Sequence, residues 1–156
     1  MAKIIALCGM VCSSKSTYAK EMKRTYNAVV LNPDVLMKAF FNERLGERHD
    51  EIFEKVRWYL YRQACDIVQA GVDVILDFGL WSRKERQEIR QFFRYKSMEV
   101  SIHHINTPLA KIRANIDKRN LCVNELNYFI DDAILEKCLS LFEIPAEDEI
   151  DEKVYN

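Results

Sequence analysis

The residues best suited to bind phosphate lie near the start of the chain, between Gly9 and Thr17. An apolar segment from Ile4 to Cys8 precedes Gly9, and Lys15-Ser16-Thr17 begins the segment that follows. This is the layout of a phosphate-binding loop, G-x-x-x-x-G-K-[ST], in which backbone N–H groups and a helix N-terminus surround the phosphates. Ser14 stands where the pattern has its second glycine.

Each part of this loop has a predicted task. Lys15 reaches the β- and γ-phosphates of a nucleotide, and the hydroxyl of Ser16 ligates Mg²⁺. Glycine is used where φ is positive or where a side chain would block the ligand, so Ser14 is expected to weaken binding without abolishing it. The motif alone is also compatible with an ordinary strand-to-helix turn. The predicted nucleotide-binding residues of the loop are Gly9, Val11, Cys12, Ser13, Ser14, Lys15, Ser16 and Thr17.

Length and composition limit the class of protein. The chain has 156 residues, 49% of them apolar and 30% charged, which predicts one globular domain over residues 1–156. A formal net charge of -1 argues against nucleic-acid and membrane-surface binding, and no segment approaches the ~20 apolar residues that span a bilayer. Five cysteines without a C-x-x-C pair favour free thiols. We expect a cytoplasmic protein without a leader, a monomer or weak dimer whose partner is a small molecule.

Apolar patterning predicts alternating strands and helices. The predicted strands cover 4–8, 28–31, 72–77 and 100–105, and the predicted helices cover 16–24, 35–41, 51–70, 83–95, 108–119 and 131–141. From Pro145 onward we expect an acidic, poorly structured tail with one short strand. This order predicts a three-layer α/β fold of the P-loop NTPase type, with a parallel sheet of four to five strands flanked by helices. No G-x-G-x-x-G follows any strand, so a dinucleotide oxidoreductase is disfavoured.

Two carboxylates follow strands of this predicted sheet. Ligands bind at the carboxyl ends of parallel strands, so Asp34 and Asp77 are expected near the phosphate-binding loop. Asp34 can orient or deprotonate an acceptor hydroxyl, although Asn-Pro-Asp is also a common helix cap. Asp77 can bind Mg²⁺, although a strand-end aspartate can equally cap the next turn.

Basic residues supply further candidates. Arg113 and Arg119 lie on the helix after the fourth strand and could stabilise transferred phosphate from a short lid around 113–127; the alternative is a solvated helix face. Arg83 and Arg86 could bind an anionic substrate at the start of a helix that Ser82 caps with Glu85. His103 and His104 are adjacent on a strand and therefore point to opposite faces of the sheet.

Together these residues resemble the small AAA-type P-loop kinase family, which is related to zeta toxin and chloramphenicol phosphotransferase. The resemblance covers nearly the whole chain and rests on residues 9–17, 32–34, 76–83, 113–120 and 142–145. It implies that Lys15 and Ser16 serve the nucleotide and Mg²⁺ and that Asp34 is the carboxylate on the acceptor side. It also implies that Arg113 and Arg119 are lid arginines. The sequence departs from the family at Ser14 and at Met37, where many relatives carry an arginine.

Three functions follow as hypotheses. The first is an ATP- and Mg²⁺-dependent kinase that transfers the γ-phosphoryl group to a hydroxyl of a small molecule. The second is a nucleotide-binding module or pseudokinase with little turnover because of Ser14. The third, a polynucleotide 5′-kinase, is disfavoured because the chain has no basic excess and no aromatic surface interleaved with basic residues.

Overall fold

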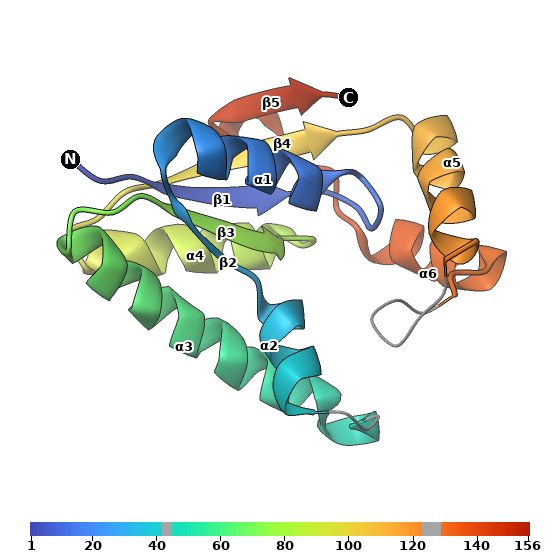
Figure 1. The fold of residues 1–156 in the computed structure, drawn as a ribbon, viewed down its shortest axis with the longest axis horizontal. Helices are drawn as coiled ribbons and strands as arrows, with labels where there is room; N and C mark the ends of the chain where they lie inside the picture. The colour runs from blue at the N-terminus through green and yellow to red at the C-terminus, as the bar shows by residue number, and fades with distance from the viewer. Residues whose placement is uncertain (42–44, 123–128) are drawn as a thin grey trace.

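A computed structural model describes residues 1–41, 45–122 and 129–156 of the chain (Figure 1). Within these residues five parallel strands form a sheet in the order β2-β3-β1-β4-β5. Because all strands run the same way, their carboxyl ends meet at one edge, on the right in Figure 1. The predicted α/β fold with a small parallel sheet is confirmed. The strands are β1 (Ile4–Cys8), β2 (Val29–Leu31), β3 (Val74–Gly79), β4 (Val100–Asn106) and β5 (Glu152–Tyr155).

The helices follow the predicted ones closely. Helix α2 begins at Pro33, earlier than expected, because proline suits the first helical turn and the side chain of Asn32 caps the helix. None of the helices in the described ranges is long and apolar enough to cross a membrane. The helices are α1 (Lys15–Tyr26), α2 (Pro33–Phe40), α3 (His49–Gln69), α4 (Arg83–Tyr95), α5 (Leu109–Asn120) and α6 (Asp132–Leu141), with short 3₁₀ turns η1 (Gly46–Arg48) and η2 (Glu147–Glu149).

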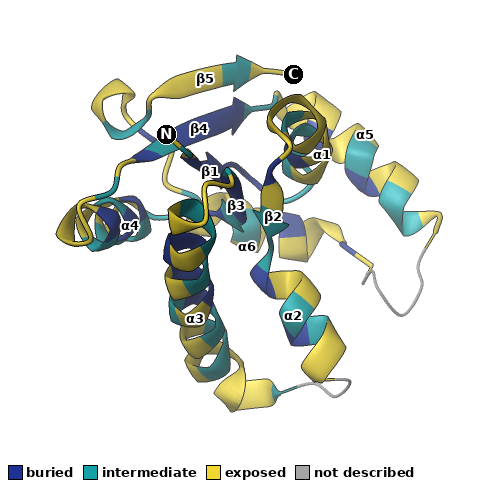
Figure 2. Cartoon of the chain, turned by 60° about the vertical axis from the view of Figure 1, so that its left-hand side comes forward, coloured by how far each residue is buried: buried dark blue, intermediate teal, exposed yellow. Residues whose placement is uncertain are grey.

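Strand β1 is buried on both faces, as its unbroken apolar sequence predicts. Ile5 packs with Ala19 of α1 on one face, and Ile4 packs with Tyr61 of α3 and Phe93 of α4 on the other. Figure 2 shows buried residues concentrated in β1, β3 and β4 and along one side of α3. Burying one such Ile side chain is worth about 1.5–3 kcal/mol, so the strand that leads into the phosphate-binding loop is firmly anchored.

A separate apolar cluster lies beyond the carboxyl edge of the sheet. Met10, which directly follows Gly9, packs there with Ile112 and Ile116 of α5 and Leu135 of α6. Val11 and Cys12 are half-buried against the same cluster. The beginning of the loop is therefore fixed by α5 and α6 as well as by β1.

The segment after Pro145 is structured, so the expectation of a poorly structured tail is wrong, although its short strand is confirmed as β5. The carboxylate of Asp151 accepts a hydrogen bond from the backbone N–H of Ile102 at 2.7 Å and pairs with Arg90 of α4, also at 2.7 Å. Asp151, one of the acidic side chains that suggested a solvated tail, thus binds to β4 and α4.

Arg86 is fully buried, so the interpretation that it binds an anionic substrate is also wrong. Its guanidinium pairs with Glu149 at 3.1 Å and donates to the carbonyl oxygen of Leu80 at 2.9 Å. Removing one partner of such a buried pair typically costs about 3–5 kcal/mol. The physical reason for the error is that the partner carboxylate of Glu149 lies far along the chain, in the segment that was expected to be poorly structured.

Candidate active site

The phosphate loop, residues 9–16, connects β1 to α1 at the carboxyl edge of the sheet. A Cβ added to Gly9 would lie 2.8 Å from the hydroxyl oxygen of Ser13 and 3.1 Å from the carbonyl oxygen of Ile105. Real Cβ atoms essentially never lie as close as 2.8 Å, and 3.1 Å is tighter than nine in ten of their contacts, so only glycine fits here without rearrangement. The first glycine of the pattern is therefore required by close packing.

The second glycine position requires a positive φ. Ser14 has φ 69° and ψ 22°, and Cys12 has φ 54°, both in the left-handed region that glycine adopts without strain. A non-glycine residue in this region costs roughly 1–2 kcal/mol. Ser14 thus carries local strain, and the loop keeps the backbone shape that the glycine would have given it.

The loop leaves several backbone donors available. The N–H groups of Val11, Cys12 and Ser14 donate to no acceptor in the described part of the chain. Successive free N–H groups beside a helix N-terminus form an anion-binding cradle. Their arrangement fits the phosphates of a nucleotide.

Side chains from distant segments hold the loop in this shape. Trp81 donates its Nε1–H to the carbonyl oxygen of Gly9 at 3.1 Å, and Asn115 donates to that of Cys12 at 2.9 Å. The carbonyl oxygen of Ser13 accepts hydrogen bonds from Thr107 at 2.8 Å and from Asn156 at 3.1 Å. These roles were not predicted from the sequence. The available signal was the position of Trp81 and Thr107 just beyond the ends of strands β3 and β4.

Lys15 points back into the loop. Its Nζ donates to the carbonyl oxygen of Met10 at 2.6 Å. Burial lowers the pKa of Lys15, and the nearby carboxylates of Asp77 and Asp34 oppose that shift. Lys15 is therefore the cation at the centre of the loop, and bound phosphate would compete with Met10 for it.

Ser16 and Asp77 meet at the end of the loop. The hydroxyl of Ser16 donates to Asp77 Oδ2 at 2.9 Å, and the side-chain amide of Asn32 donates to the same oxygen at 3.0 Å. Asp77 is buried. A hydroxyl and a carboxylate are oxygen ligands of the kind that Mg²⁺ prefers. The structure thus brings the two predicted metal ligands together.

The donor set also fits Mg²⁺ in number. The described ranges contain no group of three or more His, Cys, Asp or Glu that could hold a metal ion. Mg²⁺ is commonly bound by one or two protein ligands together with substrate phosphates and water. Ser16 and Asp77 are sufficient for such a site, and the role stays a prediction.

Asp34 lies in the first turn of α2 and is exposed. The side chain of Asn32, not that of Asp34, caps this helix, accepting a hydrogen bond from the Asp34 N–H at 2.8 Å. The Asp34 carboxylate accepts no hydrogen bond from the described residues, and its charge is close enough to act on Lys15. The structure thus leaves this carboxylate available for an acceptor, and its predicted role stays a prediction.

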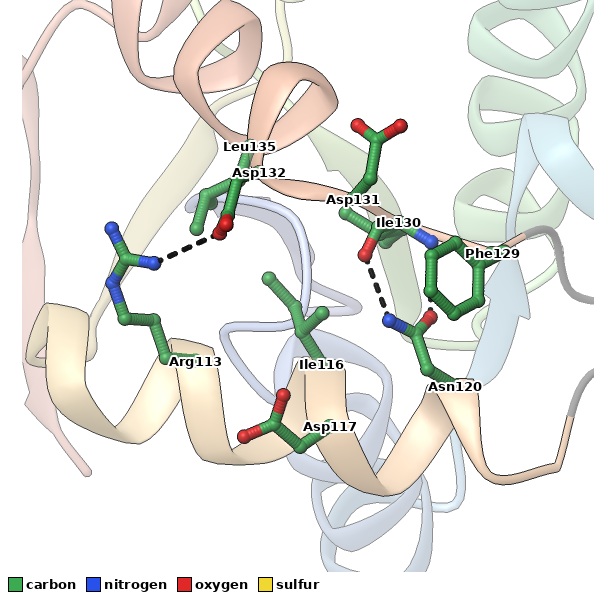
Figure 3. A pocket seen from close by; sticks show the side chains of 9 residues that line it. All are labelled: Arg113, Ile116, Asp117, Asn120, Phe129, Ile130, Asp131, Asp132 and Leu135. Carbon is green, nitrogen blue, oxygen red and sulfur yellow. Dashed lines mark hydrogen bonds and ion pairs between the residues drawn. The ribbon is translucent and has the colours of Figure 1, made fainter.

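The two predicted lid arginines lie on different sides of α5. Arg119 faces the loop, with its Nη1 3.7 Å from the Cys12 sulfur. Arg113 pairs with Asp132 at 3.3 Å across a 330 Å³ pocket between α5 and α6 (Figure 3). The structure brings Arg119 but not Arg113 to the loop, so this arrangement does not favour the nucleotide contact predicted for Arg113. Residues 123–127 of the predicted lid lie outside the described residues.

The remaining candidates lie around the site. Arg83 begins α4 with its side chain 57% exposed and 3.9 Å from Glu149. The predicted capping box of Ser82 and Glu85 is confirmed. Thr17 is exposed on the first turn of α1.

The two histidines of β4 lie on opposite faces of the sheet, as predicted. His103 lies 2.9 Å from the Tyr18 hydroxyl of α1. His104 packs on the other face, against the ring of Phe142. They form no common site.

Solved structures share this fold. A sugar kinase from Janibacter sp. HTCC2649 is 16% identical, with a TM-score of 0.63 over 100% of this chain and 85% of that chain. Kti12 from Chaetomium thermophilum in complex with ADP-AlF3 is 14% identical, with a TM-score of 0.73 over 98% of this chain and 88% of that chain. A chain of the Pnkp1/Rnl/Hen1 RNA repair complex is 21% identical, with a TM-score of 0.73 over 90% of this chain and 43% of that chain. At sequence identities this low, the structural likeness establishes a common fold.

No curated protein matches the chain. The family model described as an AAA domain matches residues 4–145, which include the phosphate loop, Asp34, Asp77 and both arginines of α5. The resemblance to small AAA-type P-loop kinases is therefore confirmed, and the chain belongs to this AAA-domain family of P-loop proteins.

Proposed function

We propose that the chain is an ATP-dependent phosphotransferase that acts, with Mg²⁺, on a hydroxyl of a small molecule. The observation that carries the proposal is the convergence of Ser16 and Asp77, 2.9 Å apart, with Lys15 and the open N–H groups of the phosphate loop. A strand-to-helix turn without function needs neither the free donors nor a buried carboxylate beside them. The family match and the kinases among proteins of the same fold support the same reading.

The reaction would proceed by in-line transfer. The acceptor oxygen forms a bond to the γ-phosphorus, the bond from that phosphorus to the β–γ bridging oxygen breaks, and ADP leaves. The open N–H groups of the loop and the Lys15 ammonium hold the β- and γ-phosphates. The Asp34 carboxylate orients the acceptor hydroxyl and takes its proton. Mg²⁺, when bound by Ser16 and Asp77, supplies charge neutralisation on the phosphates.

We propose one domain over residues 1–156 that acts as a monomer or weak dimer in the cytoplasm. The cysteines of the described ranges are free thiols, which suits a reducing compartment. The near-neutral net charge of -1 favours a small-molecule acceptor over nucleic acid.

The rival function is a nucleotide-binding module with little turnover. The strained backbone of Ser14, with φ 69°, is the observation in its favour. Both functions require nucleotide binding, so turnover separates them. Release of ADP in the presence of a screened set of hydroxylated compounds would exclude the rival.

The test compares Lys15→Ala and Asp34→Asn with the parent protein. Lys15→Ala removes the charge at the centre of the loop and should weaken Mg-ATP binding by at least tenfold, as measured by titration calorimetry. Asp34→Asn should bind Mg-ATP normally but transfer phosphate more slowly. Lys96→Ala, at the exposed C-cap of α4, is the matched control and should change neither quantity. Unchanged Mg-ATP affinity in Lys15→Ala would overturn the proposal.

A further inference from the structure

A cavity of about 440 Å³ opens beside the Ser16–Asp77 pair. It lies between α1, β2 and α2, and α3 contributes Leu60. Asn32 also lines it, next to the position proposed for the metal. A molecule bound in this cavity can therefore place one end at the site of phosphoryl transfer.

The walls of the cavity are mainly aliphatic. Leu31, Val35, Leu36 and Leu60 line it, together with Val30. Polar side chains lie at one end of this lining, where Ser16, Asn32 and Asp77 meet, and along α1, as Lys20 and Lys23. An uncharged polyol would leave most of its hydroxyls against aliphatic side chains, without partners.

The two lysines lie on the same side of α1 as Ser16. Helical rise places Lys20 about 6 Å and Lys23 about 10 Å along the axis from Ser16. Both are exposed, and neither makes an ion pair in the part of the chain that the structure describes. Two unpaired ammonium groups at this distance from the transfer site can recognise an anionic group on the bound molecule.

We propose that this cavity holds the phosphate acceptor and that the acceptor is an amphipathic alcohol. Its hydroxyl lies toward Ser16 and Asp77, its apolar body packs on Leu31, Leu36 and Leu60, and a carboxylate or phosphate at its other end pairs with Lys20 and Lys23. This inference rests on the proposed function. It separates the chain from a sugar kinase that shares its fold, because the lining of the cavity suits an aliphatic body better than a sugar.

Binding is tested by calorimetry in the presence of Mg²⁺ and a non-hydrolysable ATP analogue. The probes are ω-hydroxyoctanoate, octanediol and gluconate. We expect ω-hydroxyoctanoate to bind about three- to tenfold more tightly than octanediol, which lacks the charge. Gluconate, which has the charge without the apolar body, should bind weakest. Inorganic phosphate tests whether the two lysines accept phosphate as well as carboxylate. If they do, it should compete with ω-hydroxyoctanoate for binding.

Two variants locate the bound probe. Val35→Trp places a bulky side chain at the exposed edge of the cavity and should abolish binding of ω-hydroxyoctanoate and octanediol. The double variant Lys20→Met, Lys23→Met should remove the preference for the acid while retaining octanediol. Lys96→Met is the matched lysine control and should leave the preference intact. Affinity for the ATP analogue is measured alongside to show that each variant is folded.

The results separate this inference from the proposed function. If the ATP analogue does not bind the parent protein, the proposed function itself fails. If the analogue binds but gluconate binds more tightly than ω-hydroxyoctanoate, the assigned acceptor class is wrong. Binding of ω-hydroxyoctanoate that is unaffected by Val35→Trp would likewise overturn the assignment of the cavity.

Discussion

Ser14 and Lys15 are neighbours with different demands on the backbone. Lys15 must begin α1 so that its ammonium reaches the centre of the loop, and this requires the residue before it to turn the chain with φ 69°. Serine can adopt that conformation at a cost of roughly 1–2 kcal/mol. Asn115 supports the turn, with its Nδ2 2.9 Å from the carbonyl oxygen of Cys12 and 3.4 Å from the Ser14 hydroxyl. Serine therefore strains the loop without displacing Lys15.

Replacing Ser14 by glycine should relieve this strain. Because glycine also removes the Cβ that can crowd the bound phosphates, we expect Ser14→Gly to bind Mg-ATP up to about tenfold more tightly, which corresponds to ~1.4 kcal/mol. Glycine also adds entropy to the unfolded chain, which costs about 0.4–1 kcal/mol and offsets the relieved strain, so the thermal stability of the ligand-free protein should change little. Calorimetric titration and thermal unfolding measure the two effects separately. Unchanged or weaker binding would mean that the loop is adapted to serine, and the pseudokinase alternative would lose its main support.

At the scale of elements, the phosphate loop depends on segments that are distant in sequence. Trp81 follows β3, Thr107 follows β4, Asn115 lies on α5 and Asn156 follows β5, and each donates to a carbonyl oxygen of the loop. These contacts satisfy the carbonyl groups of Gly9, Cys12 and Ser13, while N–H groups of the loop stay available. The loop is therefore preorganised by the whole carboxyl edge of the sheet.

This arrangement also explains what the sequence could predict. Apolar runs such as Val74–Leu76 locate strands, and parallel strands bring their carboxyl ends to one edge, so Asp77 was expected near the phosphate loop. The structure extends β3 to Gly79 and places Asp77 2.9 Å from the hydroxyl of Ser16. Which side of α5 faces the loop depends on how that helix packs, so Arg113 and Arg119 could not be separated. The partners of Arg86 could not be predicted either, because Glu149 lies in a segment with no apolar periodicity.

The hydrogen bond from Trp81 to the carbonyl oxygen of Gly9 gives a prediction at the scale of elements. Trp81→Phe keeps an aromatic ring near Phe142 but removes the Nε1–H donor to the carbonyl oxygen of Gly9. A lost hydrogen bond of this kind costs about 0.5–1.5 kcal/mol, so Mg-ATP affinity should fall by up to about tenfold. Trp58→Phe is the matched control, because Trp58 packs on Tyr61 and Phe92, in the core between α3 and α4. Equal effects of the two substitutions on nucleotide affinity would show that the Trp81 hydrogen bond does not position the loop.

At the scale of the whole molecule, β4 carries one histidine on each face of the sheet. His103 on one face contacts Tyr18 of α1, and His104 on the other packs against Phe142. Both imidazoles are therefore buried. Burial lowers the pKa of His103, and the carboxylates of Glu152 and Asp151 oppose the shift. Burial also lowers the pKa of His104 from 6.5 to about 4, aided by the charges of Lys153 and Arg86. The folded protein therefore holds both side chains as neutral imidazoles at neutral pH.

These shifts predict that the protein loses stability in mild acid. Between pH 6.5 and about 4 the unfolded chain binds a proton at His104 that the folded protein does not bind, so the free energy of unfolding falls as the pH is lowered. The shift at His104 corresponds to a loss of up to roughly 3 kcal/mol across this interval. Urea denaturation at pH 7 and at pH 4.5 measures the change. His104→Gln removes this titration and should reduce the loss, whereas His49→Gln, at the exposed start of α3, should leave it as in the parent. An identical loss in His104→Gln and the parent would show that His104 does not govern the acid response. The decrease would then have to come from other groups, such as His103, whose pKa burial lowers, or Glu149, whose pKa, against the opposing effect of burial, is held low by hydrogen bonds from Ala146 and Arg86.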